Sequence, residues 1–226
     1  AQEQRAVVRA AVARDRLHQQ PGELCRGQGE AEAEQHAGER RQHARTVAAN
    51  RFLVHAKVAD EFTRMFAAAM ADVRIGNGFD DGVTCGPMIN AKAVASINEL
   101  VTAAADHGAT IATGGGTVDG PGHFYPPTVL GNVRPGDEIT RHEIFGPVAP
   151  VVRFSTEAEV IAMANDTEFG LASYFYTRDI GRVWRVAEAL EYGIVGINEG
   201  MISNEMAPFG GVKESGSGRE GSKYGI

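Results

Sequence analysis

A change of composition near residue 45 limits which part of this 226-residue chain can form a core. Residues 1–45 contain no Phe, Tyr, Trp, Ile, Met or Lys, but they hold eight arginines and seven glutamines. A segment of this kind buries too little apolar surface to offset its conformational entropy. We therefore expect residues 1–46 to be an aberrant segment, either disordered or read from a shifted frame, and a folded domain to begin at residue 47.

The composition of the whole chain excludes several classes of protein. The chain is 43% hydrophobic and 23% charged, with a net charge of -7. An acidic balance argues against nucleic acid as a partner, because binding a phosphate backbone requires a basic patch. No apolar run reaches the ~18 residues of a membrane-spanning helix. Because Cys25 and Cys85 form neither a disulfide framework nor a metal-ligand pattern, we expect a cytoplasmic protein without a metal.

Helical and strand patterns alternate along residues 47–226. Apolar residues in 57–73 share one helical face, and Asn90 is placed to cap a second helix that ends near His107. Short helices are expected to begin after Thr156 and after Asp179. Strands are expected at 109–113, 128–130, 148–154, 171–177 and 193–198. This alternation predicts an α/β fold in which a mostly parallel sheet is flanked by helices.

The glycines Gly216, Gly218 and Gly221 match the pattern G-x-G-x-x-G. A dinucleotide site of this type requires a strand before the glycines and a helix after them. The preceding letters, PFGGVKES, are not typical of a strand, and only five residues follow Gly221. We interpret the match as accidental.

Longer segments carry a more specific resemblance. The segments EIFGPVAPVVRF (143–154), ANDTEFGLAS (164–173) and APFGGVKESGSGREGSKYG (207–225) resemble consecutive signatures of the aldehyde dehydrogenase superfamily. AANRFLVH (48–55) and IGNGFDDGVTCGPMIN (75–90) agree in order and spacing. The stretch VGINEGMISNEMAPFGG (195–211) resembles the succinate-semialdehyde dehydrogenase branch. The resemblance covers residues 47–226 and implies part of a catalytic domain with an α/β fold.

The resemblance implies roles for four residues. Glu143 would hold the hydroxyl groups of the nicotinamide ribose of NAD or NADP, and Phe145 would pack beside the nicotinamide. Phe209 would line the aldehyde pocket, and Ser203 would donate a hydrogen bond to the far carboxylate of the substrate. The alternatives are a surface charge for Glu143, core packing for Phe209 and a loop serine for Ser203. The substrate implied is a small semialdehyde, either succinate or glutarate semialdehyde.

The nucleophile that the resemblance implies is not found in this chain. A Cys is expected four residues before Asn50, within a Gly-x-x-Cys segment, but that position is Thr46. An unactivated hydroxyl is a far weaker nucleophile than a thiolate. Neither the Glu-Leu-Gly-Gly segment of the general base nor a dinucleotide-binding domain precedes it. We therefore assign no catalytic residue and expect this chain, a homologue of a homo-oligomeric NAD(P)-dependent dehydrogenase, to be inactive alone. The alternatives are a non-catalytic interaction or assembly module and a pseudogene product.

The two interpretations of residues 1–46 differ in what the coding DNA should contain. A frameshift predicts that another frame across codons 1–50 encodes Glu-Leu-Gly-Gly and then Gly-x-x-Cys running into AANRF. A genuine extension predicts that no frame does so. Resequencing the coding DNA and translating all frames distinguishes the two.

Overall fold

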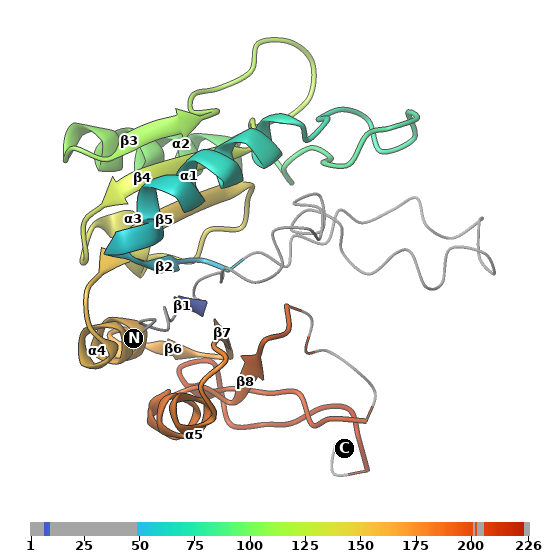
Figure 1. Cartoon of the computed structure of the whole chain (residues 1–226). Coiled ribbons are helices and arrows are strands. Elements are labelled where there is room, and N and C mark those ends of the chain that lie inside the picture. The colour runs from blue at the N-terminus through green and yellow to red at the C-terminus, as the bar shows by residue number, and fades with distance from the viewer. Residues whose placement is uncertain (1–6, 10–48, 201, 203–205, 224–226) are drawn as a thin grey trace. The chain divides into compact units, whose positions relative to one another are not determined.

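The computed structural model describes residues 7–9, 49–200, 202 and 206–223 (Figure 1). The chain divides into two compact units, which we describe separately. The central unit contains the described residues of 17–50 and residues 60–151. The C-terminal unit contains the described residues of 1–16, residues 51–59 and the described residues of 152–226.

The two long helices follow the apolar periodicity of the sequence. Helix α1 (Ala56–Ala71) buries Phe66 and Met70, and α2 (Ala91–Asp106) buries Ile97 and Val101. Asn90 caps α2, because its side-chain oxygen accepts the N–H of the third helical residue at 2.8 Å. His107 follows the last turn as the C-cap. Both predicted helices are confirmed.

The sheet of the central unit is covered on both faces. Strands β5 (Val148–Phe154), β4 (Thr128–Val133) and β3 (Thr110–Thr113) are adjacent in this order, and β3 is antiparallel to β4. Five of the six residues of β4 are buried, which requires neighbours on both sides of the strand. Helices α1 and α2 lie on opposite faces of these strands (Figure 1). A short helix, α3 (Glu138–Arg141), precedes β5.

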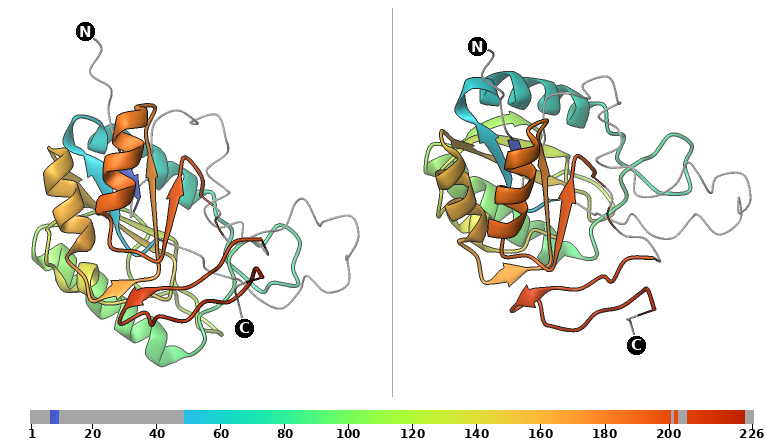
Figure 2. Two further views of the ribbon diagram at one scale, coloured as in Figure 1. Left: turned by 90° about the horizontal axis from the view of Figure 1, so that it is seen from below. Right: turned by 60° about the horizontal axis from the view of Figure 1, so that its bottom comes forward.

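The C-terminal unit contains several short elements. They are β1 (Val7–Arg9), β2 (Phe52–His55), α4 (Glu157–Asn165), β6 (Phe169–Gly170), β7 (Ala172–Tyr176), α5 (Ile180–Ala189), β8 (Ile194–Ile197) and β9 (Val212–Lys213). Strand β7 is parallel to β8 and antiparallel to β1, and β6 is antiparallel to β9. Helices α4 and α5 lie side by side, as do β6 and β9 (Figure 2). The α/β class is therefore confirmed, with mixed sheets.

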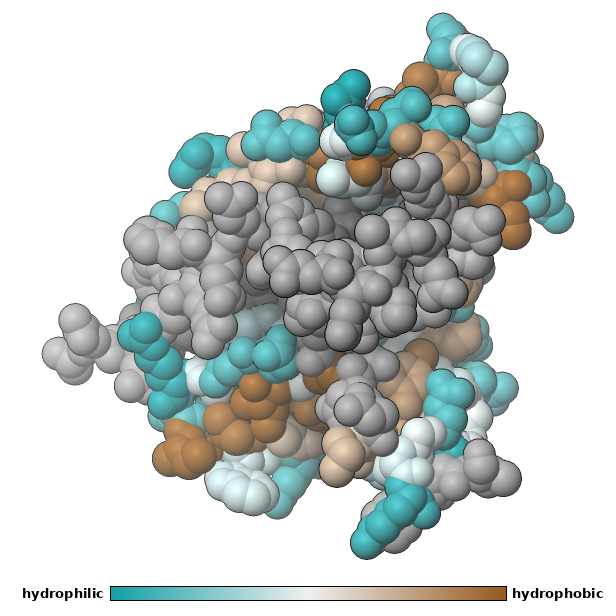
Figure 3. All heavy atoms as spheres, turned by 90° about the vertical axis from the view of Figure 1, so that its right-hand side faces the viewer, coloured by the Kyte–Doolittle hydropathy of each residue, from teal (hydrophilic) through white to brown (hydrophobic). Residues whose placement is uncertain are grey.

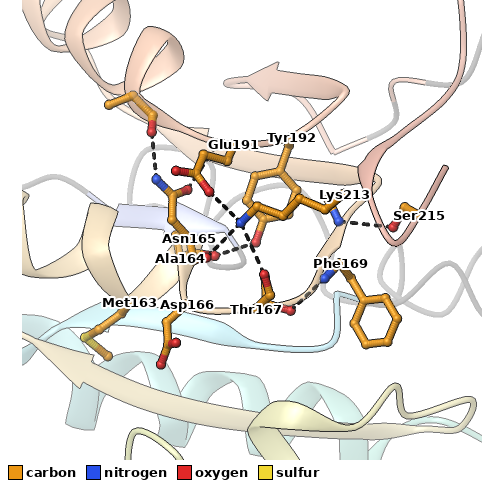
Figure 4. A network of polar contacts seen from close by, with 12 residues as sticks. Met163, Ala164, Asn165, Asp166, Thr167, Phe169, Glu191, Tyr192, Lys213 and Ser215 are labelled. Carbon is orange, nitrogen blue, oxygen red and sulfur yellow. Dashed lines mark hydrogen bonds and ion pairs between the residues drawn. The ribbon is translucent and has the colours of Figure 1, made fainter. Parts of the chain in front are cut away.

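A buried guanidinium closes the C-terminal end of α4. Arg51 is only 9% exposed, and its Nη1 and Nη2 donate to the carbonyl oxygens of Met163 and Ala164 at 3.0 Å each. Its Nη2 also donates to the Tyr192 hydroxyl at 3.1 Å, and that hydroxyl donates to Ala164 O at 2.6 Å. Figure 4 shows the acceptor residues at the end of α4 together with Tyr192. The last carbonyl groups of a helix lack partners within the helix, so one cation satisfies several of them.

Replacing Arg51 with Ala is expected to lower the free energy of unfolding by about 2–4 kcal/mol, because it leaves buried carbonyl groups without donors. Arg51→Lys should lose less, since an ammonium keeps the charge but not the fork of donors. Urea denaturation followed by circular dichroism measures both. The matched control is Arg64→Ala on the exposed side of α1. An equal loss of unfolding free energy in that variant would contradict the prediction.

A second charged cluster joins α4 to α5. Glu157 Oε2 lies 2.6 Å from Arg182 Nε, and Glu157 Oε1 lies 3.0 Å from Arg185 Nε. The hydrogen bond from Arg185, supported by the one from Arg182, holds the pKa of Glu157 below its ordinary value of 4.5. The carboxylate is partly screened from solvent, with 28% of its side chain exposed.

A lowered folded-state pKa means that Glu157 stabilises the folded state when it is ionised. This stabilisation is complete above pH 4.5 and is lost as the pH falls through the lower folded-state pKa. Glu157→Gln should therefore lower the free energy of unfolding by about 1 kcal/mol at pH 7, and the difference should shrink at acidic pH. Denaturation across this pH range tests the sign. Glu188→Gln, an exposed position on α5, is the control and should show no such trend.

Candidate functional site

Glu143 lies on an irregular segment between α3 and β5. Helix α3 ends at Arg141, and His142 has the extended conformation φ -88 and ψ 146. Ile139 of α3 and Ile144 are buried on either side of Glu143, at 1% and 8% exposure. The Glu143 side chain itself is exposed. Burial of its neighbours therefore anchors the backbone while the carboxylate stays accessible.

The side-chain amide of Asn50 forms hydrogen bonds on both sides of Glu143. Asn50 Nδ2 donates to the carbonyl oxygen of His142 at 2.7 Å, and Asn50 Oδ1 accepts the N–H of Ile144 at 2.6 Å. Only one orientation of the amide satisfies both contacts, because a carbonyl oxygen can only accept and an N–H can only donate.

Phe145 presents its ring to solvent, with 72% of the residue exposed. The next residue, Gly146, packs against α2, because a Cβ atom there would lie 2.3 Å from the Cδ1 atom of Ile97 and would force that side chain to shift. A single exposed apolar ring is common on protein surfaces, so exposure alone does not mark a site.

Glu143 and Phe145 are both exposed and lie two residues apart in the chain. Within the described part of the chain, the Glu143 carboxylate has no hydrogen-bond or ion-pair partner. A carboxylate can accept hydrogen bonds from two neighbouring hydroxyl groups, and an exposed aromatic ring can pack against a flat heterocycle. These are the groups of a nicotinamide riboside, so the residues present fit the cofactor that the family resemblance implies.

Phe209 lies in the C-terminal unit, at the end of the chain segment that follows β8. Its backbone N–H donates to the carbonyl oxygen of Glu220, and its carbonyl accepts the N–H of Glu220, each at 2.8 Å. The side chain is half-buried, which is compatible both with core packing and with lining a pocket. Ser203 lies outside the described residues.

Lys213 anchors the segment that carries Phe209 to the end of α4. Its Nζ donates to the carbonyl oxygens of Asn165 and Thr167 at 2.9 and 3.1 Å, and forms an ion pair with Glu191 at 2.5 Å (Figure 4). The hydroxyl of Ser215 accepts the N–H of Gly170 at 3.0 Å. These contacts join the segment ANDTEFGLAS (164–173) to the segment APFGGVKESGSGREGSKYG (207–225).

Asn198 fixes the other end of the segment that leads to Phe209. It follows β8 with a φ of 56, and its amide donates to Thr177 O and accepts Thr177 N–H, each at 2.9 Å. This pair joins the ends of the parallel strands β7 and β8. The segment that contains Ser203 therefore leaves from one fixed point, Asn198, and returns to another at Phe209.

Sequence reasoning did not assign roles to Asn50, Asn198 or Lys213. Each lies within a segment that carried the resemblance, but its hydrogen-bond partner is distant in the sequence, so pattern alone could not reveal the contact. Among the described residues, those after β9 form turns and an isolated bridge, and the interpretation of the G-x-G-x-x-G match as accidental stays a prediction.

The residues that the structure describes contain no group of three or more His, Cys, Asp or Glu side chains that could hold a metal ion. No helix among them is long and apolar enough to cross a membrane. Cys85 is half-buried, and its backbone pairs with that of Ile75 in an isolated parallel β-bridge.

Comparison with known proteins agrees with the resemblance. Residues 35–226 match the sequence model of the aldehyde dehydrogenase family. Glutarate-semialdehyde dehydrogenase of Pseudomonas putida is 57% identical over 180 residues, which are 80% of this chain and 37% of that protein. The NADP(+) succinate-semialdehyde dehydrogenase of Escherichia coli is 55% identical over 180 residues, with the same coverage of 80% and 37%.

A solved structure is similar over the same extent. The crystal structure of succinate-semialdehyde dehydrogenase from Burkholderia pseudomallei superposes with a TM-score of 0.77 at 54% identity, covering 80% of this chain and 37% of that one. The chain thus spans a little over a third of the length of the relatives it matches. Because the family match covers most of the chain and the fold agrees with it, the chain belongs to the aldehyde dehydrogenase family.

Proposed function

We propose that this chain forms part of the catalytic domain of an NAD- or NADP-dependent dehydrogenase acting on a semialdehyde with a distant carboxylate, namely succinate or glutarate semialdehyde. The observation that carries the proposal is the exposed pair Glu143 and Phe145 on a backbone segment held from both sides. The names of relatives at 55% and 57% identity support the substrate class. The whole enzyme would be a cytoplasmic homo-oligomer.

Each site residue has a distinct part in this proposal. The Glu143 carboxylate accepts hydrogen bonds from the ribose hydroxyl groups, which are charge-assisted and therefore stronger than neutral ones. Phe145 packs against one side of the nicotinamide and limits the access of water to it. Phe209 provides an apolar wall for the aldehyde, and the Ser203 hydroxyl donates to the far carboxylate. When bound, the nicotinamide supplies the hydride acceptor.

The same proposal assigns no turnover to this chain as written. The position four residues before Asn50 holds Thr46, whose hydroxyl is a poor nucleophile unless a base activates it. Covalent capture of an aldehyde requires a nucleophile at that position in the proposed mechanism. The chain would therefore retain ligand-binding surfaces without the reaction.

The second candidate function is a non-catalytic interaction or assembly module. The observation that favours it is the exposure of Ile180 and Trp184, one turn apart on α5, at 71% and 64%. Hydrophobic residues also form separate patches among hydrophilic ones on the face drawn in Figure 3. This candidate predicts a defined oligomer that Trp184→Ser disrupts, together with no binding of a nicotinamide nucleotide.

Binding of reduced nicotinamide mononucleotide, followed by its fluorescence, tests the leading proposal directly. This probe carries the ribose and nicotinamide but no adenosine, so it reports on the contacts assigned here. Glu143→Gln is expected to weaken binding about tenfold, because it removes charge-assisted hydrogen bonds, and Phe145→Ala should weaken it by a similar factor. Glu99→Gln, an exposed carboxylate on α2, is the control and should bind normally.

Two results would contradict this proposal. One is a failure of the unmodified chain to bind the probe, and the other is equal binding by the Glu143 and control variants. Incubation of the purified chain with succinate or glutarate semialdehyde and either NAD or NADP should yield no reduced cofactor. Turnover that persists through repeated purification would disprove the assignment of inactivity.

A further inference from the structure

The Asn50 amide is the feature that determines how Glu143 is presented. Its contacts at 2.7 Å with His142 O and at 2.6 Å with Ile144 N reach across 92 and 94 residues of sequence. The amide thus takes the place of a neighbouring strand, because it offers one donor and one acceptor to the two peptide groups that flank a single residue.

No regular element supplies these contacts otherwise. Residues 143–145 belong to neither a helix nor a strand, and the nearest helical contact is the bond from His142 N to Glu138 O at 3.0 Å. The Ile144 N–H is part-buried and donates to Asn50 Oδ1. A buried peptide group without a partner is costly, so the segment is held in the conformation that keeps both bonds.

Holding the peptide groups on both sides of Glu143 restricts the direction of its Cα–Cβ bond. The Glu143 carboxylate must accept two hydrogen bonds from a rigid diol. If its backbone is mobile, the site binds the ligand more weakly, because part of the binding free energy is used to order the segment. The two hydrogen bonds of Asn50, which we call the Asn50 clamp, order the segment before the ligand binds and so remove that cost.

We propose that Asn50 is a positioning residue for the nicotinamide-ribose contact, acting through the backbone of residues 142–144 and not by touching the ligand. This inference rests on the proposed function, since it assigns to Glu143 the ribose contact described above. It adds a residue for which neither the resemblance nor the comparisons supply a role. The ligand class is the same, a nicotinamide ribonucleotide.

The experiment combines two readouts on the full chain. The first is amide hydrogen exchange at Ile144, and the second is the dissociation constant for reduced nicotinamide mononucleotide. Asn50→Ala should speed exchange at Ile144 about tenfold or more and weaken binding about threefold to tenfold, because the peptide group loses its acceptor. Asn50→Asp keeps an acceptor for Ile144 but sets a carboxylate against His142 O, so it should weaken binding while exchange stays slow.

The matched control is Asn90→Ala in the same unit. It removes one side-chain bond to a backbone N–H, at 2.8 Å, from the cap of α2. Its stability should fall by an amount similar to that of Asn50→Ala, but its exchange at Ile144 and its affinity for the probe should stay as in the unmodified chain. Equal loss of affinity in the control would reduce Asn50 to a general stabilising residue and overturn the proposal.

The remaining outcomes separate this inference from the proposed function. Unchanged exchange at Ile144 in Asn50→Ala, or faster exchange with unchanged affinity, overturns the positioning role while the proposed function stands. If the unmodified chain does not bind the probe, the nicotinamide proposal is overturned. The role of Asn50 in positioning Glu143 for the ribose is then overturned as well. Exchange at Ile144 then still shows whether Asn50 holds the segment.

Discussion

The buried guanidinium of Arg51 is the interaction on which the C-terminal unit depends most. Arg51 directly precedes β2 and donates hydrogen bonds to carbonyl oxygens at the end of α4. The last carbonyl groups of a helix have no hydrogen-bond donors within the helix. The Ala164 carbonyl also accepts the Tyr192 hydroxyl, and Lys213 donates to the carbonyl oxygens of Asn165 and Thr167. Backbone oxygens at and just after the end of one helix therefore accept hydrogen bonds from side chains of three separate parts of the unit.

Asn50 and Arg51 are consecutive residues that solve the same physical problem in different units. Each supplies side-chain hydrogen bonds to backbone groups that no regular element pairs, Asn50 at residues 142–144 and Arg51 at the end of α4. Functional side chains commonly lie on irregular segments, and such segments are precise only when something outside them fixes their backbone. The segment with Glu143, the proposed ribose contact, is held in this way, because its neighbours are buried and both of its peptide groups bond to Asn50 while its carboxylate remains exposed.

The elements that the sequence predicted well are those with their own periodicity or cap. Asn90, Thr156 and Asp179 each accept a backbone N–H at the start of a helix, and these caps are local features readable from three or four letters. Strand β2, helix α3 and the pair β6 and β9 were not predicted. The two-residue strands β6 and β9 have no pattern of their own and exist only because 169–170 and 212–213 meet. The predicted mostly parallel sheet proved mixed, since pairing direction depends on connections between distant strands.

The sequence by itself indicated the family, the α/β class, the helices with their own periodicity or cap, and the proposed site residues Glu143, Phe145, Ser203 and Phe209, because each depends on local pattern or on contiguous motifs. Only the tertiary structure decided which side chains and backbone groups of these motifs contact one another. Gly146 packs against Ile97 of α2 beside the exposed Phe145, and the Asn50 amide bonds to the peptide groups on both sides of Glu143. These contacts join residues tens of positions apart, and only the packed chain brings their atoms within hydrogen-bonding distance.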